Sequence, residues 1–199
     1  MAKIRLTKNE LKKQKDELKR YVQYLPTLTL KKQQLQMEIR KIEAQEAELK
    51  RDRELYFQEI LGWIAVFGED VGFSELLTVT SLDTEVGNIA GVDIPVFLDI
   101  HFEEAPYDLF ALPLWVDKAI DKVKELASLD ARIVIFEKQS ELLGEELRIT
   151  SQRVNLFEKV KIPETRENIR LIQIYLGDEQ TAAVVRGKIA KKKLVRVSQ

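Results

Sequence analysis

Apolar residues recur at alternating steps of three and four along the first third of this chain, from Leu11 to Phe67. With position a of a heptad at Leu11 and position d at Gln14, 13 of the 17 a and d positions are apolar or aromatic. This fixed pattern predicts a coiled-coil helix, which needs a second helix to cover its apolar stripe. The positions are Leu11, Gln14, Leu18, Tyr21, Leu25, Leu28, Lys32, Leu35, Ile39, Ile42, Glu46, Leu49, Arg53, Tyr56, Ile60, Trp63 and Phe67.

A second heptad pattern near the other end of the chain supplies the partner helix. Seven of its nine positions are apolar, and they are Leu129, Ile133, Phe136, Ser140, Leu143, Leu147, Thr150, Val154 and Phe157. Two such helices in one chain can cover each other's apolar stripes as a coiled coil. Pro26 is expected to kink or interrupt the first helix, and Pro163 to interrupt the second. Beyond Gly177 the apolar stripe fades.

Between the helices, residues 76–103 are rich in β-branched and aromatic residues and partly alternate with polar ones. This pattern predicts two or three short strands, including a hairpin with its turn in residues 87–91. The predicted fold class is therefore mainly α, a long two-helix coiled coil with a short β-hairpin insert. The predicted segments are an N-terminal helix over residues 1–67, the insert over 68–113 and a C-terminal helix with a basic tail over 114–199.

Charge is strongly segregated although the net charge is only −1. Residues 1–20 hold eight Lys or Arg against three acids, and residues 186–199 hold six Lys or Arg and no acid. From Glu54 to Asp117 there are thirteen acids and no Lys or Arg. Antiparallel pairing would place both basic ends at one tip and the acidic segment at the other, which favours two protein partners. Nucleic acid is a weaker candidate, because the basic tail lacks aromatic residues.

Residues that carry chemistry are scarce in the sequence. There is no cysteine, and the single histidine, His101, lies in an alternating run without an evident Ser or Cys partner. No phosphate-binding glycine motif is present, because Val92 and Asp93 follow the glycine-rich stretch where a lysine would be needed. We therefore expect no catalytic residue, cofactor or metal site, no membrane-spanning segment and no secretory signal. The lack of cysteine fits a cytosolic location.

Several motifs resemble the D subunit of the V-type and A-type rotary ATPases. The most specific block is Arg153-Val154-Asn155-Leu156-Phe157-Glu158 followed by Ile162-Pro163 and Asn168-Ile169-Arg170-Leu171-Ile172. The stretch Asn88-Ile89-Ala90-Gly91-Val92-Asp93-Ile94-Pro95 is similar to a middle segment of that family. Leu6-Thr7-Lys8-Asn9-Glu10-Leu11 and Leu30-Lys31-Lys32-Gln33-Gln34-Leu35 resemble its two N-terminal elements.

The resemblance implies a non-catalytic, central-stalk rotor protein, cytoplasmic and peripheral to the membrane. It also implies that the two long helices form a left-handed antiparallel coiled coil. Such a rotor couples ATP hydrolysis or synthesis in a catalytic hexamer to rotation of a membrane ring and to proton or sodium transport. Its implied partners are the catalytic and non-catalytic hexamer subunits, a small stalk subunit (the F subunit) and a funnel-shaped subunit on the ring. Residues expected to face the hexamer bore are Arg5, Lys8, Lys12, Lys13, Lys188, Lys191, Lys192 and Lys193. Residues expected on the side of the small stalk subunit are Val86, Gly87, Asn88, Ile89, Gly91, Val92 and Pro95.

Two alternatives share parts of this architecture. A prefoldin-type chaperone subunit also joins two terminal coiled-coil helices by β-hairpins, but its helix tips are apolar rather than basic. The γ-type shaft of the F-type enzyme needs a large α/β domain between its helices, and the insert here is too short for one. For Arg153 and Asn155 the sequence leaves two roles open, which are the registration of the helices and contact with a partner.

Overall fold

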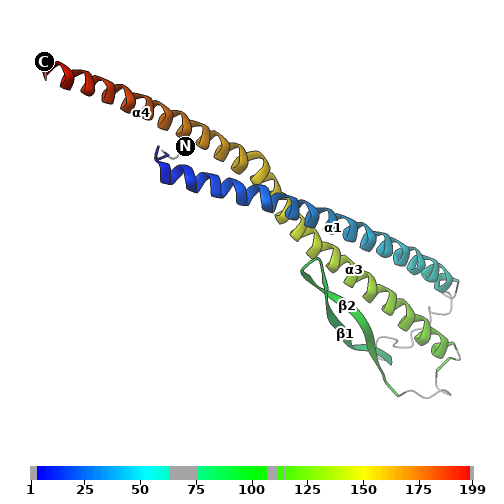
Figure 1. The fold of residues 1–199 in the computed structure, drawn as a ribbon. Helices are drawn as coiled ribbons and strands as arrows, with labels where there is room; N and C mark the ends of the chain where they lie inside the picture. Colours follow the sequence, from blue (N-terminus) through cyan, green and yellow to red (C-terminus); the bar gives the residue numbers. More distant parts are fainter. Residues whose placement is uncertain (1–3, 63–75, 107–111, 114, 198–199) are drawn as a thin grey trace. The chain divides into compact units, whose positions relative to one another are not determined.

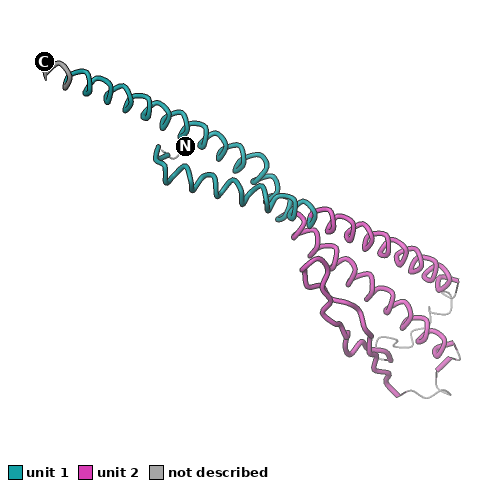
Figure 2. The backbone as a smooth tube through the Cα atoms, viewed as in Figure 1, with its two compact units in different colours: residues 1–31, 149–199 teal, residues 32–148 magenta. Residues whose placement is uncertain are grey.

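The structure is a computed structural model that describes residues 4–62, 76–106, 112–113 and 115–197 of the 199-residue chain. In chain order the elements are α1 (Lys8–Leu61), β1 (Leu77–Ile89), β2 (Val92–Glu104), α3 (Val116–Leu156), a π-helical turn η1 (Phe157–Lys161) and α4 (Ile162–Val197) (Figure 1). Two compact units are present (Figure 2): unit 1 comprises residues 1–31 and 149–199, and unit 2 comprises residues 32–148. The heptad positions Trp63 and Phe67 and the predicted segment boundary after residue 67 lie outside the described residues.

The helix α1 begins at a threonine cap and continues through its internal proline. The backbone N–H of Glu10 donates to Thr7 Oγ1 at 3.3 Å, the first half of the capping box that the sequence predicts. Pro26 lies inside the unbroken 54-residue helix, so it does not interrupt the helix as the sequence suggested. In a regular helix an N–H at position 26 would donate a hydrogen bond to the carbonyl oxygen of Val22. Proline lacks this donor, but Val22 is half-exposed, so water can donate to that oxygen instead.

The predicted heptad pattern is confirmed over its described length. Every a and d position from Leu11 to Ile60, and all nine positions from Leu129 to Phe157, are buried or partly buried. The helices pair in antiparallel fashion: in unit 2, Arg53 of α1 meets Asp130 of α3, and Lys122, earlier in α3, meets Glu59, later in α1. A hydrophobic repeat of 3.5 residues sustained in this way imposes a left-handed supercoil.

Unit 2 has a core where three elements meet. Leu35 and Ile42 of α1, Leu143 of α3 and Ile94 of β2 are all nearly or fully buried, and they form one apolar cluster. The tip of the hairpin packs against this cluster through Ile89, Ala90 and Val92. The hairpin is thus anchored on the helix pair by its turn, with its strands running beside α3 (Figure 1).

The hairpin itself has two 13-residue antiparallel strands, longer than the sequence suggested. Its loop is the two residues Ala90 and Gly91, which both have positive φ (52° and 78°), as a type I′ turn requires. The predicted turn was wider, but Gly87, Asn88 and Ile89 pair with β2. Gly87 is needed for packing, because a Cβ atom there would lie 2.8 Å from Cγ2 of Val96.

In unit 1 the seam moves by one residue at η1. Val154 belongs to the predicted heptad, but the corresponding residue of the next heptad is the buried Ile162, eight positions later instead of seven. The N–H of Ile162 donates to the carbonyl of Phe157, the i→i+5 bond of a π turn, which accommodates one extra residue. Pro163 follows directly within α4. The predicted interruption is therefore wrong, because the wide turn absorbs the irregularity and the chain remains helical.

This phase shift can be tested by deleting single residues in a Pro163→Ala variant. The Pro163→Ala substitution is needed because a proline at this position would clash with the preceding turn once the helix becomes a regular α-helix. Deletion of Val160, inside η1, should convert the π turn to an α turn and keep the seam aligned, with a stability change within about 1 kcal/mol. Deletion of the exposed Arg166 should rotate Ile169, Ile172 and Leu176 off the seam and cost about 3 kcal/mol or more. Urea denaturation measures both, and equal losses would contradict the role given to η1.

Candidate partner-binding surfaces

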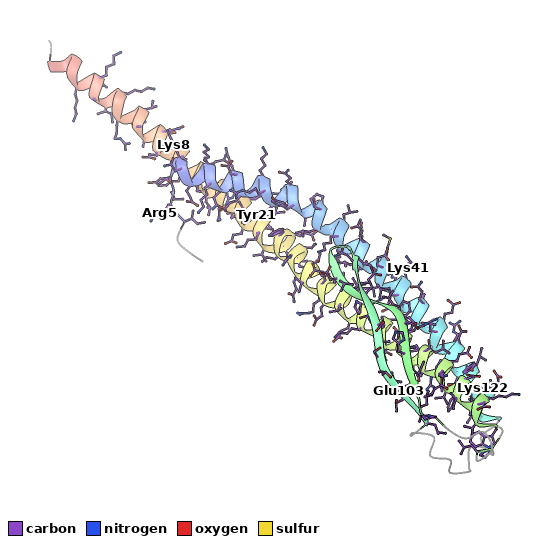
Figure 3. The ribbon with its side chains drawn as sticks, turned by 90° about the horizontal axis from the view of Figure 1, so that it is seen from below. Arg5, Lys8, Tyr21, Lys41, Glu103 and Lys122 are labelled. Atoms are coloured by element: carbon purple, nitrogen blue, oxygen red, sulfur yellow. The ribbon has the colours of Figure 1, made fainter. Side chains whose placement is uncertain are left out.

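One candidate surface is the basic end of unit 1, where α1 begins and α4 ends. Arg5 and Lys8 lie at the start of α1 (Figure 3). Lys8 and α4 residues of this unit line a shallow hollow, and those residues are Leu176, Glu179, Gln180, Ala183 and Arg186. All eight side chains expected to face a bore are exposed, and none takes part in an ion pair within the described part of the chain. Their charge is therefore available to a partner.

The end of α4 continues beyond the first residue of α1 as a single helix (Figure 1). From Arg186 to Val197 it extends about 16 Å, at 1.5 Å per residue. Ile189 in this stretch is 52 % exposed, and Val184 and Val185 just before it are 58 and 49 % exposed. The sequence predicts that the apolar stripe fades in this region but does not single out these three residues. The fading of the apolar stripe could have identified them, since apolar side chains that lie off the seam have no second helix to cover them.

The hairpin residues expected on the side of the small stalk subunit are divided between interior and surface. Ile89 and Val92 pack into the core of unit 2, so they stabilise the hairpin's position. Val86 is 75 % exposed, and Asn88 and Gly91 are exposed as well. Asn88 supports the turn, because its Oδ1 accepts from the N–H of Gly91 at 3.1 Å and its Nδ2 donates to Asp93 at 2.7 Å. Gly87 and Pro95 are partly buried.

Polar contacts at the seam of unit 2 involve two of the charged a positions, Glu46 and Arg53. Lys50 of α1 binds both Glu46 on its own helix and Glu137 on α3, at 2.6 and 2.7 Å. The hydrogen bond to Glu137, followed by that to Glu46, raises the pKa of Lys50 to about 12. Arg53, also at an a position, pairs with Asp130 at 3.0 Å. These pairs favour one alignment of the two helices, because a shift of one turn would separate the partners.

Tyr56 lies near the far end of the same seam. The ammonium of Lys122 lies 4.9 Å from the centre of its ring. Desolvation of the phenol, together with its hydrogen bond to Glu125, raises the pKa of Tyr56 well above its usual range. The phenol of Tyr56 therefore stays neutral at physiological pH and does not act as a proton donor or acceptor through ionisation there.

The motif that carried the family resemblance contains both seam and surface residues. Val154 and Ile162 are 7 % exposed and belong to the seam on either side of η1. Arg153, Asn155 and Pro163 are exposed. Neither Arg153 nor Asn155 makes a hydrogen bond or ion pair with another described residue, so no such bond of theirs links the helices in this part of the chain.

Helix pairing in unit 1 instead depends on other contacts. Asn168 Nδ2 of α4 donates to Oε1 of the buried Gln14, at 3.3 Å. Gln14 in turn donates to Glu10 at 3.0 Å. The rings of Tyr21 and Phe157 pack with their centres 5.3 Å apart. A polar d position such as Gln14 specifies alignment, because a shifted pairing would leave its amide buried without a partner.

The single histidine has neighbours that the sequence did not reveal. His101 pairs across the hairpin with Ser81, so the expectation that no serine lies near it is wrong. His101 Nε2 lies 3.0 Å from Oδ2 of Asp83, and the hydroxyl of Ser81 donates to Oδ1 of the same aspartate at 3.5 Å. A catalytic triad needs the imidazole between the hydroxyl and the carboxylate, whereas here the carboxylate lies between them. This exposed group has no arrangement for nucleophilic catalysis.

The described residues offer neither a metal cluster nor a membrane-spanning helix. Among them, no three His, Cys, Asp or Glu side chains are grouped so that they could hold a metal ion. None of the described helices combines the length and the apolar composition needed to cross a membrane.

Comparison with known proteins identifies relatives along nearly the whole chain. The family model for the D subunit of ATP synthase matches residues 10–192. The chain is 52 % identical to the V-type ATP synthase D subunit of Borreliella burgdorferi, over 98 % of this chain and 97 % of the relative. It is 36 % identical to the protein of that name in Chlamydia trachomatis serovar L2, over 97 % of both chains. The Chlamydia pneumoniae protein is 34 % identical, over 96 % of this chain and 93 % of its own.

Proposed function

Because the chain belongs to the family of ATP synthase D subunits, we propose that it is the central rotor shaft of a V-type rotary ATPase. In this role it binds no nucleotide itself. ATP binding and hydrolysis in a surrounding hexamer turn the shaft, and the shaft turns a membrane ring that moves protons or sodium ions. The reverse rotation would drive ATP synthesis. Membership of this family removes the need for the prefoldin-type explanation of the same order of helices and hairpin.

One observation supports the shaft role above the others: α4 runs on past the start of α1 as a single helix, and its residues 186–193, which include Arg186 and four lysines, are exposed (Figure 1). A shaft that turns inside a hexamer must touch its bearing without adhering to it. Exposed Lys and Arg side chains suit such a contact, because a large apolar interface would resist rotation. Solvated charge pairs are individually weak and exchange readily. We assign the bore-facing role to the basic end of unit 1.

The paired helices support the transmission of torque. A shaft must resist twisting, and two helices joined along a seam twist together rather than past each other. In unit 2 the ion pairs of Lys50 and Arg53 oppose sliding between α1 and α3. In unit 1 the Gln14–Asn168 hydrogen bond has the same effect.

The remaining partners are assigned to the other surfaces. We propose that the small stalk subunit binds the outer side of the hairpin, where Val86 is exposed, and that a funnel-shaped subunit links the shaft to the membrane ring. The buried hairpin residues Ile89 and Val92 support this site from beneath rather than touching the partner. Arg153 and Asn155, exposed and without partners in the described chain, are proposed to contact another protein of the complex.

Reconstitution tests the proposal. The catalytic hexamer from the same source is assayed for ATPase activity with and without this chain, and the stoichiometry is measured by native mass spectrometry. We expect one copy per hexamer and a clear change in turnover, since a single asymmetric shaft makes the three catalytic sites unequal. Self-association of the chain without binding to the hexamer, together with suppression of aggregation of an unfolded client protein, would contradict the proposal and favour a chaperone.

A further inference from the structure

The two outer edges of the β-hairpin have different environments. The edge of β2 lies along α3 and is held there by three contacts. Lys124 Nζ binds Glu104 at 2.5 Å, the Arg132 guanidinium lies 5.0 Å from the ring centre of Phe97, and Gln139 Nε2 donates to the carbonyl of Pro95. Within the described residues the sheet has no third strand, and β1 lies on the side of β2 away from α3 (Figure 1). No described residue therefore covers the outer edge of β1.

The pairing register shows which backbone groups face that open edge. Pro95 has no N–H, and its carbonyl accepts from Gln139 on α3, so its backbone points away from β1. Val86 is paired with Pro95, and opposed residues in such a pair both direct their N–H and C=O groups outward. The alternation of an antiparallel ladder gives Thr84 and Asn88 the same orientation. Thr84, Val86 and Asn88 thus direct backbone donors and acceptors outward, and these groups have no partner among the described residues.

Natural proteins usually protect such an edge with charged residues, especially lysine, with proline, with a β-bulge or with a short strand. The 13-residue strand β1 contains no Lys, Arg or Pro, and its two register shifts, between Val79 and Ser81 and between Asp83 and Thr84, lie before residues 84–88. Its side chains add apolar surface, since Val79, Leu82 and Val86 are 57, 41 and 75 % exposed. An edge of this length with exposed apolar residues is a template for an added strand.

The charge of the hairpin decides which strand can be added. Residues 77–104 contain six acids and no Lys or Arg. The carboxylate-bearing residues Asp83 and Glu85 of β1 are exposed, as are Asp99 and Glu103 of β2. A second copy of this chain would bring a second acidic strand to the edge, and like charges on adjacent strands repel. A basic strand of another protein would meet complementary charge.

We propose that a basic, extended segment of another protein pairs with the open edge of β1 at residues 84–88 and completes a three-stranded sheet. This inference rests on the proposed function in one respect, because it takes the small stalk subunit as the protein that supplies the segment. The added strand would use backbone hydrogen bonds for affinity and the acidic side chains for selectivity. The hairpin anchored on α3 would then be a rigid platform rather than a flexible arm.

The test compares two variants of one residue, Thr84→Pro and Thr84→Ala, in the full chain with the purified small stalk subunit. Proline removes an outward N–H but leaves the β1–β2 ladder intact, because Thr84 occupies the same kind of pair as Val86. We expect Thr84→Pro to weaken binding by about tenfold, as for one unsatisfied backbone group, and Thr84→Ala by less than about twofold. Equal weakening in the two variants would contradict the backbone pairing. Helical circular dichroism and thermal midpoints check that both variants fold.

Hydrogen–deuterium exchange on the unsubstituted chain gives a second measurement. Amides of Thr84 and Val86 should exchange at least about tenfold more slowly in the complex, and the protection should weaken as salt screens the acidic side chains. Binding of the small stalk subunit with unchanged exchange at these amides would overturn the edge pairing and leave the proposed function intact. Failure of that protein to bind the chain at all would overturn both the partner assignment and this inference.

Discussion

Replacing Leu143 with alanine is expected to lower the free energy of unfolding by about 3–5 kcal/mol. Leu143 is fully buried at the point where α1, α3 and the tip of the hairpin meet. Truncation of this side chain leaves a cavity. The two helices and the hairpin cannot move in to fill it, because each element is held by other contacts along its length. The loss should therefore include a cavity term in addition to the transfer free energy of the missing atoms.

Urea denaturation of the isolated chain measures this effect. The matched control is Val134→Ala, since Val134 lies on the same helix, is 59 % exposed and should change stability by less than about 0.5 kcal/mol. In Leu143→Ala the amides at the tip of the hairpin should also exchange faster, because the tip packs on this side chain. Equal losses in the two variants would mean that the three elements do not share a core.

Reversing the three charges Lys191→Glu, Lys192→Glu and Lys193→Glu is expected to reduce the apparent affinity of the chain for the catalytic hexamer by about tenfold or more. Three exposed pairs, each worth about 0.3–1 kcal/mol, would change from attraction to repulsion. The three lysines lie on the part of α4 that extends past the start of α1. ATPase activity titrated against the chain at constant hexamer concentration measures the loss.

The control for net charge is Arg40→Glu, Arg51→Glu and Arg148→Glu, which makes the same change of charge at three exposed positions of unit 2. We expect the control to retain most of the affinity, and the difference between the two triple variants to shrink as salt rises. If the control variant lost as much affinity as the α4 variant, the hexamer would not bind specifically at the lysines of α4. If the difference in affinity between the two triple variants did not change with salt concentration, an electrostatic contact would be excluded.

Much of the fold could be predicted from residue spacing, because the burial of a coiled-coil seam is repeated along each helix. The heptad pattern predicted which face of α1 is covered even at charged positions such as Arg53, which the structure pairs with Asp130. The hairpin could also be predicted, because β-branched residues around a glycine-rich turn have few other conformations. The basic set proposed to face the bore contains only exposed residues, as its charge suggested.

Other features depended on contacts between distant segments. The sequence marked Pro163 as an irregularity but did not reveal that a π turn would absorb it, since that outcome depends on the burial of Ile162 and Thr165 in unit 1. The motif around Asn88 looked like one functional segment. Only the docking of the hairpin tip on Leu35 and Leu143 showed that Ile89 supports the structure while Val86 faces outward.

The sequence by itself determined that this chain forms two long paired helices with a hairpin between them, and it determined the sign of charge at each end of the helix pattern. These properties follow from the spacing of apolar residues and from local composition, both of which can be seen in the sequence itself. The tertiary structure decided which strand edge stays open and which residues of the hairpin are buried. Those depend on α3 covering β2 and not β1, a relation between segments that no local pattern contains.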